Sequence, residues 1–236
     1  MDISNNKFGL TSNNLKLIAA ISMFFDHFGM VFFPYSSIFR IIGRLAFPIY
    51  AFMIAEGCRH TRNKKRYFLT IALMATVFQL IYFFVLGDIY QGILVTFSLS
   101  IAIIFSVDSL IKSKSVQNWI LMILVICAAL FFGIAMPIIF EKEGFIIDYG
   151  VFGIFLPVII YFAPSKKSKL IFTAIFLAVM SIFSNPIQWW ALLSVLLLAL
   201  YNGERGKRKM KYFFYIFYPL HLVLIYGAYI LISIIK

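Results

Sequence analysis

Long apolar stretches separated by short polar segments constrain this chain more than any other feature of its sequence. Nine such stretches run approximately over residues 15–33, 40–58, 67–86, 92–111, 118–140, 150–163, 168–184, 188–201 and 212–235. A helix that spans the hydrocarbon core of a bilayer needs about 20 apolar residues, and most of these stretches approach that length. The sixth and eighth are shorter, which predicts tilted, half-length or re-entrant segments. The pattern predicts an all-α polytopic integral membrane protein with about nine transmembrane helices.

The composition also indicates a lipid environment. Hydrophobic residues make up 63% of the 236 residues and charged residues only 13%, whereas about a quarter of a typical soluble domain is charged. The net charge of +12 does not indicate a nucleic-acid partner, because the basic residues lie in short clusters between apolar stretches. We therefore expect membrane lipids to surround the chain and no nucleic acid to bind it.

Basic residues are concentrated in alternate loops. Fifteen of the 21 Lys and Arg residues lie within residues 59–66, 112–114, 166–169 and 205–211. The positive-inside rule places these loops in the cytoplasm, so nine crossings of the cell membrane leave the N-terminus inside and the C-terminus outside. Residues 1–14 are then a cytoplasmic segment, and residues 15–236 form a single transmembrane domain. We expect no signal peptide, because the first stretch contains Asp26 and His27 and no small-residue cleavage site follows it.

Ionisable residues inside transmembrane segments are costly and usually functional. The first stretch contains Lys16 and, eleven residues later, His27. At about 100° per residue these two side chains project from the same helix face, separated by roughly 16 Å along the axis. Asp26 points about 100° away from His27 and is expected to meet a different neighbour. Two alternatives stay open: Lys16 only extends to the membrane surface, and His27 is a hydrogen-bonded packing residue.

Arg40 and Arg44 lie four residues apart near the start of the second stretch, so they share one helix face. In an antiparallel hairpin with the first stretch, Arg44 lies about as far from the outer surface as His27. It is then placed to pair with Asp26 or with a substrate anion. An arginine pair that binds lipid headgroups is the alternative. Pro48 is predicted to kink this helix.

Three further features complete the set of candidates. His221 lies about ten residues into the last apolar stretch, and favours a shared polar site, with a histidine bonded only to backbone as the alternative. Asp148 and Tyr149 open the sixth stretch, where Asp148 is also a candidate helix cap. Cys58 and Cys127 lie within or beside apolar stretches and are interpreted as buried thiols without a disulfide or metal role.

Five blocks of this sequence carry a resemblance to a known family. They are Leu15–Ala19 with Asp26–His27, Arg40–Pro48, Glu56–Gly57 with His60–Asn63, Asp148–Gly153, and Phe214–His221. In this order they resemble the TraX family, membrane proteins named after a conjugative-pilus pilin N-acetylase. The spacing from Lys16 to His27 is also similar to the motif that opens the wider membrane acyltransferase superfamily, where the first residue is typically arginine.

The resemblance implies transfer of an acyl group, expected to be acetyl, from acetyl-CoA to an amine or hydroxyl. His27 is expected to act as the general base, or as a transient acyl carrier. Asp26 or His221 then orients His27 or relays its proton. Arg44 is expected to stabilise the oxyanion of the tetrahedral intermediate.

The same resemblance implies binding residues on both sides of the membrane. The residues expected to bind the phosphates of the acyl-CoA donor are Lys16, Arg59 and Arg62. The residues expected to contact a peptide or glycan acceptor are Arg40, Asp148 and Tyr149. No zinc-ligand spacing, phosphate-binding loop or Gly-x-Ser-x-Gly elbow occurs in the sequence, so no metal is expected.

Two other classes of protein fit the same residues. A transporter or channel would use intramembrane Asp, His and Arg side chains as a proton relay, and the two short stretches resemble discontinuous transporter helices. A membrane-embedded chaperone or assembly factor would need no chemistry at all. Binding of acetyl-CoA distinguishes the acyltransferase from both, because neither alternative needs that ligand.

Overall fold

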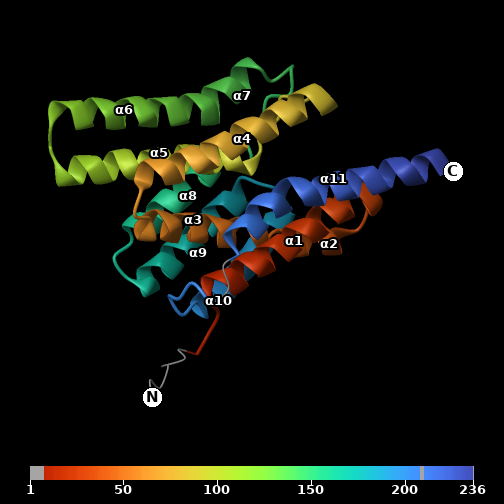
Figure 1. Cartoon of the computed structure of the whole chain (residues 1–236), viewed down its shortest axis with the longest axis horizontal. Coiled ribbons are helices and arrows are strands. Elements are labelled where there is room, and N and C mark those ends of the chain that lie inside the picture. Colours follow the sequence, from red (N-terminus) through yellow and green to blue (C-terminus); the bar gives the residue numbers. More distant parts are fainter. Residues whose placement is uncertain (1–7, 208–209, 236) are drawn as a thin grey trace. The chain divides into compact units, whose positions relative to one another are not determined.

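The computed structural model describes residues 8–207 and 210–235, and its regular structure is helical (Figure 1). In chain order the helices are α1 Ser12–Phe32, α2 Ser37–Gly43, α3 Ala46–His60, α4 Lys64–Leu86, α5 Ile93–Lys112, α6 Val116–Leu130, η1 Phe131–Ala135, α7 Met136–Ile139, α8 Gly150–Phe162, α9 Lys166–Ile182, η2 Pro186–Leu192, α10 Leu193–Ala199 and α11 Lys211–Ile235. Here η1 is a π-helical turn and η2 is a 3₁₀ helix. Within the described ranges, extended pairing is limited to two isolated bridges, Leu10–Tyr201 and Gln91–Ile147.

Among the described residues, six helical segments are long and apolar enough to cross a membrane, judged by length and composition. They are Ser12–Phe32, Ser37–His60, Lys64–Phe84, Ile93–Lys112, Val116–Ile139 and Ile216–Ile235. Two shorter apolar helices, Gly150–Phe162 and Pro186–Ala199, match the sixth and eighth stretches. The structure therefore supports a helical, multi-pass membrane protein, whereas the number of crossings stays a prediction.

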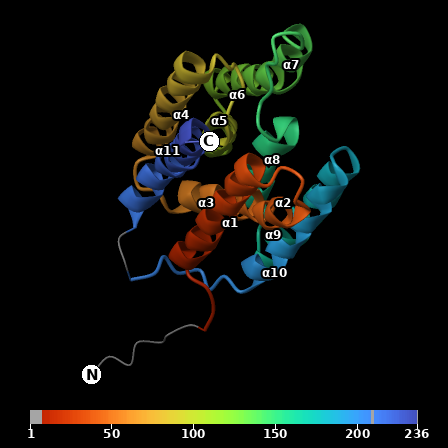
Figure 2. The same ribbon diagram turned by 90° about the vertical axis from the view of Figure 1, so that its right-hand side faces the viewer.

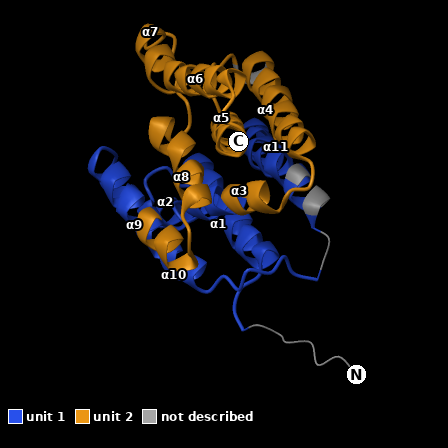
Figure 3. Cartoon of the chain, turned by 90° about the vertical axis from the view of Figure 1, so that its left-hand side faces the viewer, with its two compact units in different colours: residues 1–53, 173–236 blue, residues 54–172 orange. Residues whose placement is uncertain are grey.

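The chain packs as two compact units (Figure 3). Unit 1 contains residues 1–53 and 173–236, and unit 2 contains residues 54–172. The single transmembrane domain expected from the sequence stays a prediction, because compact packing alone does not show independent folding.

The second apolar stretch is broken at Arg44. Helix α2 ends at Gly43 and α3 begins at Ala46, so Arg44 lies in the turn between them. Pro48 explains the position of this break, since a proline ring clashes with the carbonyl group four residues earlier, here that of Arg44. The helix is therefore interrupted for two residues, Arg44 and Leu45, just before Pro48, and Arg44 stands on that turn.

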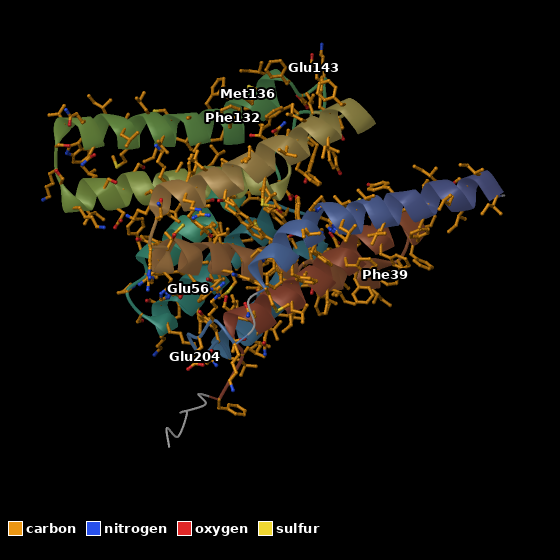
Figure 4. The ribbon with its side chains drawn as sticks, in the orientation of Figure 1. Phe39, Glu56, Phe132, Met136, Glu143 and Glu204 are labelled. Carbon is orange, nitrogen blue, oxygen red and sulfur yellow. The ribbon has the colours of Figure 1, made fainter. Side chains whose placement is uncertain are left out.

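In unit 1, α1 lies between α2 and α11 (Figure 2). Two glycines permit the close approach of α1 and α2. A Cβ atom added at Gly29 would lie 2.2 Å from Cβ of Phe39, which is labelled on α2 in Figure 4. A Cβ atom added at Gly43 would lie 2.2 Å from Oδ1 of Asp26. A larger side chain at either position would push the two helices apart.

Helices α1 and α11 run in the same direction. Three pairs of side chains meet in the same order along both helices: Lys16 with Phe214, His27 with His221, and Phe32 with Tyr229. The start of α1 is also bonded to the loop that precedes α11, because Ser12 N donates to Glu204 O over 2.8 Å. Both helices therefore begin at the same end of unit 1.

In unit 2, the basic loops gather at one end. The start of α4 meets the end of α5 through ion pairs of Lys64 and Lys112 with Asp108. The last turns of α3 meet the start of α9 through an ion pair between Glu56 and Lys169. The three predicted cytoplasmic loops of this unit, residues 59–66, 112–114 and 166–169, thus lie together.

The remaining loops of unit 2 lie at its other end. Gln91 N donates to Ile146 O over 2.7 Å, and Asp148 N donates to Gln91 O over 2.9 Å. Figure 4 shows Glu143 at this end and Glu56 toward the opposite end. Within this unit, the loops therefore alternate between two ends in the order that the charge pattern predicts.

Cys127 corrects one expectation from the sequence. Cys58 is buried as expected, but Cys127 is exposed on α6. The prediction that both thiols are buried was therefore wrong for Cys127. The physical reason is that lipid, like a protein core, accepts apolar side chains, so a Cys in an apolar helix can face outward.

Candidate functional site

One carboxylate and two guanidinium groups form an ion cluster in unit 1. Asp26 Oδ1 lies 2.9 Å from Arg40 Nη1, and Arg44 Nη2 donates to both carboxylate oxygens over 3.1 and 2.9 Å. The side chains of Asp26 and Arg44 are only 14% and 12% exposed, whereas that of Arg40 is 32% exposed. The pairing of Arg44 with Asp26, one of the two partners expected from the sequence, is present in the structure.

The ion cluster carries one net positive charge, because two guanidinium groups face one carboxylate. Charges in a transmembrane segment are stable only when they are paired and hydrogen-bonded. Asp26 lies six residues before the end of α1, which places it roughly 9 Å from that end. The cluster is therefore well inside the segment and on the half of α1 that is remote from Lys16.

Gln188 belongs to the ion cluster and was not predicted from the sequence. Arg44 Nη1 donates to Gln188 Oε1 over 3.3 Å, and Gln188 is 5% exposed. Because arginine has no acceptor, this contact fixes the orientation of the amide and directs its Nε2 group elsewhere. The signal in the sequence was one amide side chain at the first position of the apolar stretch 188–201.

His27 of α1 and His221 of α11 form a histidine pair on another face of α1. Nδ1 of His27 lies 3.2 Å from Nε2 of His221. Each Nδ1 atom is also close to the carbonyl oxygen four residues earlier, Met23 O at 2.9 Å for His27 and Phe217 O at 2.8 Å for His221. His221 is 2% exposed, and its ring stacks on that of Phe217.

These contacts determine where the hydrogens of the neutral pair lie. A carbonyl oxygen only accepts, so Nδ1 of each ring carries a hydrogen and donates it. His221 Nε2 then accepts from His27 Nδ1, and His27 Nε2 keeps a free lone pair. No described residue donates to that Nε2 atom. The contact with His221 therefore orients the ring of His27.

Lys16 lies toward the beginning of the same α1 face. Its Nζ atom is 6.0 Å from the centre of the Phe214 ring, and Arg205 is within electrostatic range. Because Phe214 and His221 both belong to α11, the contacts agree with the predicted common face of Lys16 and His27. Arg205 is a cation that the sequence analysis had not assigned to the donor site.

The other two predicted phosphate ligands lie in unit 2. Arg59 donates to the backbone carbonyl of Tyr161, and its guanidinium lies 5.4 Å from the centre of the Tyr161 ring. Arg62 is exposed in the loop between α3 and α4. Their role in donor binding stays a prediction.

Asp148 and Tyr149, expected to contact the acceptor, also lie in unit 2. The carbonyl oxygen of Asp148 accepts a hydrogen bond from Thr96 Oγ1 over 2.9 Å. Tyr149 has a left-handed φ of 57° and is the N-cap residue of α8, so Asp148 is not the cap residue itself. Both residues thus connect the 141–149 loop to α5 and α8, and their contact with an acceptor stays a prediction.

Unit 2 contains a second polar group that the sequence analysis missed. Glu56 and Lys169 form an ion pair in which each residue is 9% exposed, and His60 Nε2 lies 3.5 Å from the same carboxylate. The two partners are 113 residues apart, so no local spacing could reveal the pair.

In the described part of the chain, no group of three or more His, Cys, Asp or Glu residues is arranged to hold a metal ion.

The charge balance of the ion cluster predicts unequal effects of two substitutions. Asp26→Asn leaves two guanidinium groups without a carboxylate and should lower the free energy of unfolding by about 3–5 kcal/mol. Arg44→Met leaves the neutral pair of Asp26 and Arg40 and should cost less. Thermal unfolding of the purified variants in detergent measures both effects. A larger loss for Arg44→Met than for Asp26→Asn would contradict this account of the cluster.

Comparison with known proteins gives one family and one similar protein. The family model described as TraX protein matches residues 11–229, a range that contains the ion cluster and the histidine pair. The chain is similar to the probable fimbrial assembly protein FimC, serogroup H1, of Dichelobacter nodosus, with 24% identity over 237 residues covering 91% of this chain and 93% of the relative. No solved structure matches the chain. Since the family model covers almost the whole sequence, the chain belongs to the TraX family.

Proposed function

We propose that this protein is a membrane-embedded acyltransferase that moves an acetyl group from cytoplasmic acetyl-CoA to an amine or hydroxyl of an acceptor. The observation that carries the proposal is the histidine pair, whose hydrogen bonds leave Nε2 of His27 as a basic atom without a protein partner. A histidine that served only for packing would not need a second histidine to orient it. Membership of the TraX family supports the same class of reaction.

His27 acts as the general base in the proposed reaction. Its Nε2 atom takes the proton of the acceptor amine or hydroxyl while that nitrogen or oxygen attacks the thioester carbonyl carbon. The carbon–sulfur bond then breaks, and the leaving thiolate takes the proton from His27. While His27 is charged, its Nδ1–H donates to His221 Nε2 and Met23 O, which stabilises the imidazolium.

Arg44 has a positioning role in this proposal. Its guanidinium donates to Asp26, to Gln188 and to the carbonyl oxygen of Arg40. Through these hydrogen bonds, Arg44 holds the other side chains of the ion cluster in position. The oxyanion contact that the sequence suggested for Arg44 stays a prediction.

The donor binds along the face of α1 that joins Lys16 to His27. Lys16 and Arg205 form a positive end that suits the phosphates of coenzyme A. The separation of eleven positions from Lys16 to His27 corresponds to roughly 16 Å of helix, a length that an extended pantetheine arm bridges. The acetyl group then reaches His27 while the phosphates stay at the membrane surface.

The acceptor is proposed to be a peptide of a fimbrial or pilus subunit. The similar protein of Dichelobacter nodosus carries a name that refers to fimbrial assembly. The TraX resemblance points to N-acetylation of a pilus subunit. A glycan acceptor is the alternative, and mass spectrometry of pilus peptides and surface glycans from a deletion strain would distinguish the two by the acetyl group that is lost.

The proposed topology has nine crossings of the cell membrane, with the N-terminus in the cytoplasm and the C-terminus outside. Two packing features support it. In unit 1, α1 and α11 begin at the same end, together with the 203–207 loop. In unit 2, the basic loops lie at one end and the loops at 87–91 and 141–148 lie at the other. Each pattern agrees with the positive-inside rule.

Substitution of His27 tests the catalytic base. His27→Ala should lower the rate of acetyl transfer by about two to four powers of ten, because general base catalysis is lost. His221→Ala should impair transfer less, since it orients the base. The remaining histidine of the chain, His60, supplies a matched control. Its side chain is 68% exposed, and His60→Ala should be nearly as active as the wild type. Near-normal turnover by a folded His27→Ala protein would exclude His27 as the base.

Charge reversal at Lys16 tests the donor site. Lys16→Glu should raise the KM for acetyl-CoA about 10- to 100-fold with little change in kcat, because a charge-assisted contact to phosphate contributes about 1.5–3 kcal/mol. Lys142→Glu, at an exposed residue of the opposite loop set, is the matched control. Coenzyme A should also raise the Tm of the wild-type protein, which a transporter of unrelated solutes would not show. An unchanged KM would mean that Lys16 only marks the membrane boundary.

Labelling of single cysteines tests the topology. After removal of Cys58 and Cys127, cysteines placed at exposed loop positions should react with a membrane-impermeant reagent according to the side they occupy. The positions expected to be cytoplasmic are Lys65, Lys114, Lys167 and Lys207, and those expected to be outside are Asp88 and Glu143. Labelling of intact cells against permeabilised cells gives the side of each. One basic loop labelled in intact cells would refute the nine-crossing arrangement.

A further inference from the structure

Two buried side-chain donors in the ion cluster have no hydrogen-bond partner. They are Nε2 of Gln188 and Nη1 of Arg40, and in the described part of the chain no other buried side-chain nitrogen or oxygen is left in this state. Arg40 Nη1 lies at ion-pair distance from Asp26, but it makes no hydrogen bond. An unsatisfied buried donor is costly, so two in one cluster indicate a missing acceptor.

The charge of the ion cluster shows what kind of acceptor is missing. Two guanidinium groups and one carboxylate leave a net charge of one positive unit. Such an excess in a transmembrane segment is unfavourable, and an anion of one negative charge would cancel it. A carboxylate has that charge, and it accepts from an amide and a guanidinium at the same time. A phosphate of two negative charges would reverse the imbalance.

The position of the cluster separates it from both the donor and the reacting atoms. Asp26 lies ten residues beyond Lys16, roughly 15 Å along α1, so the anion is not a phosphate held at the Lys16 end. Asp26 contacts arginines of the α2 region, whereas His27 contacts α11, and successive helical residues point about 100° apart. An anion in the cluster therefore lies beside the base, where a second group of the same acceptor would sit.

We propose that Gln188, Arg40 and Arg44 form a binding site for a carboxylate of the acceptor. Gln188 Nε2 and Arg40 Nη1 are the donors that bind it, and Arg44 fixes the amide in the required orientation. The identity of the bound molecule as an acceptor rests on the proposed acyltransferase function. Its class is then a peptide that carries an acidic residue close to the amine that is acetylated.

The first test uses benzoate as a carboxylate probe and benzamide as its uncharged counterpart of the same shape. Thermal unfolding of the purified protein is followed in a nonionic detergent at constant ionic strength. Millimolar benzoate should raise the Tm by about 2 °C or more in a saturable manner, and benzamide should not. Equal effects of benzoate and benzamide would overturn the proposal.

Substitutions of Gln188 locate the effect. Gln188→Leu removes the free donor and should abolish the response to benzoate. Gln188→Glu places a carboxylate in the cluster itself, so it should both abolish that response and raise the Tm above that of the wild type. Gln79→Glu is the matched control, because Gln79 is a partly buried membrane glutamine whose Nε2 atom already donates to Tyr90 O over 2.7 Å. That control should lower the Tm.

Three other results would contradict the proposed carboxylate site. A benzoate response that persists in Gln188→Leu would place the anion elsewhere. A loss of Tm in Gln188→Glu as large as that in Gln79→Glu would show that the cluster lacks no negative charge. If the wild-type protein shows no benzoate response and Gln188→Leu lowers kcat, the free donor would be assigned to the oxyanion instead. The Tm measurements need no acetyl transfer, so benzoate protection without detectable transfer would refute only the proposed activity.

Discussion

Pairing of charge inside the membrane is the constraint on which unit 1 depends. Asp26 is tolerable in α1 only because two guanidinium groups reach it. Arg44 reaches it from a turn that Pro48 imposes, and the missing side chain of Gly43 leaves room for the carboxylate. A helix break and a glycine that look like local irregularities are therefore requirements of one buried ion cluster.

The neighbouring residues Asp26 and His27 serve different parts of the site because helical geometry turns them apart. Asp26 faces the α2 region, where its charge is neutralised, and His27 faces α11, where a second histidine orients it. His27 nevertheless stays within electrostatic range of Asp26, Arg40 and Arg44. A single helix thus contributes to both the ion cluster and the histidine pair without direct bonding between them. This separation leaves His27 bonded to the histidine pair and not to the ion cluster.

Local sequence patterns predicted the features that depend on local geometry. Stretch length predicted the helices, and helical spacing predicted that Lys16 and His27 share a face and that Asp26 meets another neighbour. Gln188 and the Glu56–Lys169 pair were missed, since their partners lie 144 and 113 residues away in the chain. The exposure of Cys127 was missed for another reason. In a membrane protein an apolar neighbourhood can be core or lipid, and hydrophobicity does not distinguish them.

Helices α1 and α11 are in contact but lie far apart in the sequence, and this separation sets the order in which their contacts can form during synthesis. His27 and His221 are 194 residues apart, and all of unit 2 is synthesised between them. We expect Asp26 to pair with its arginines once α1 and α2 have both entered the membrane, because Arg44, the farther of the two, is only 18 residues away in the chain. The contact between His27 and His221, in contrast, needs α11 beside α1. The ion pairs of Asp26 can therefore form early in translation, whereas the histidine pair forms only after α11 has been made.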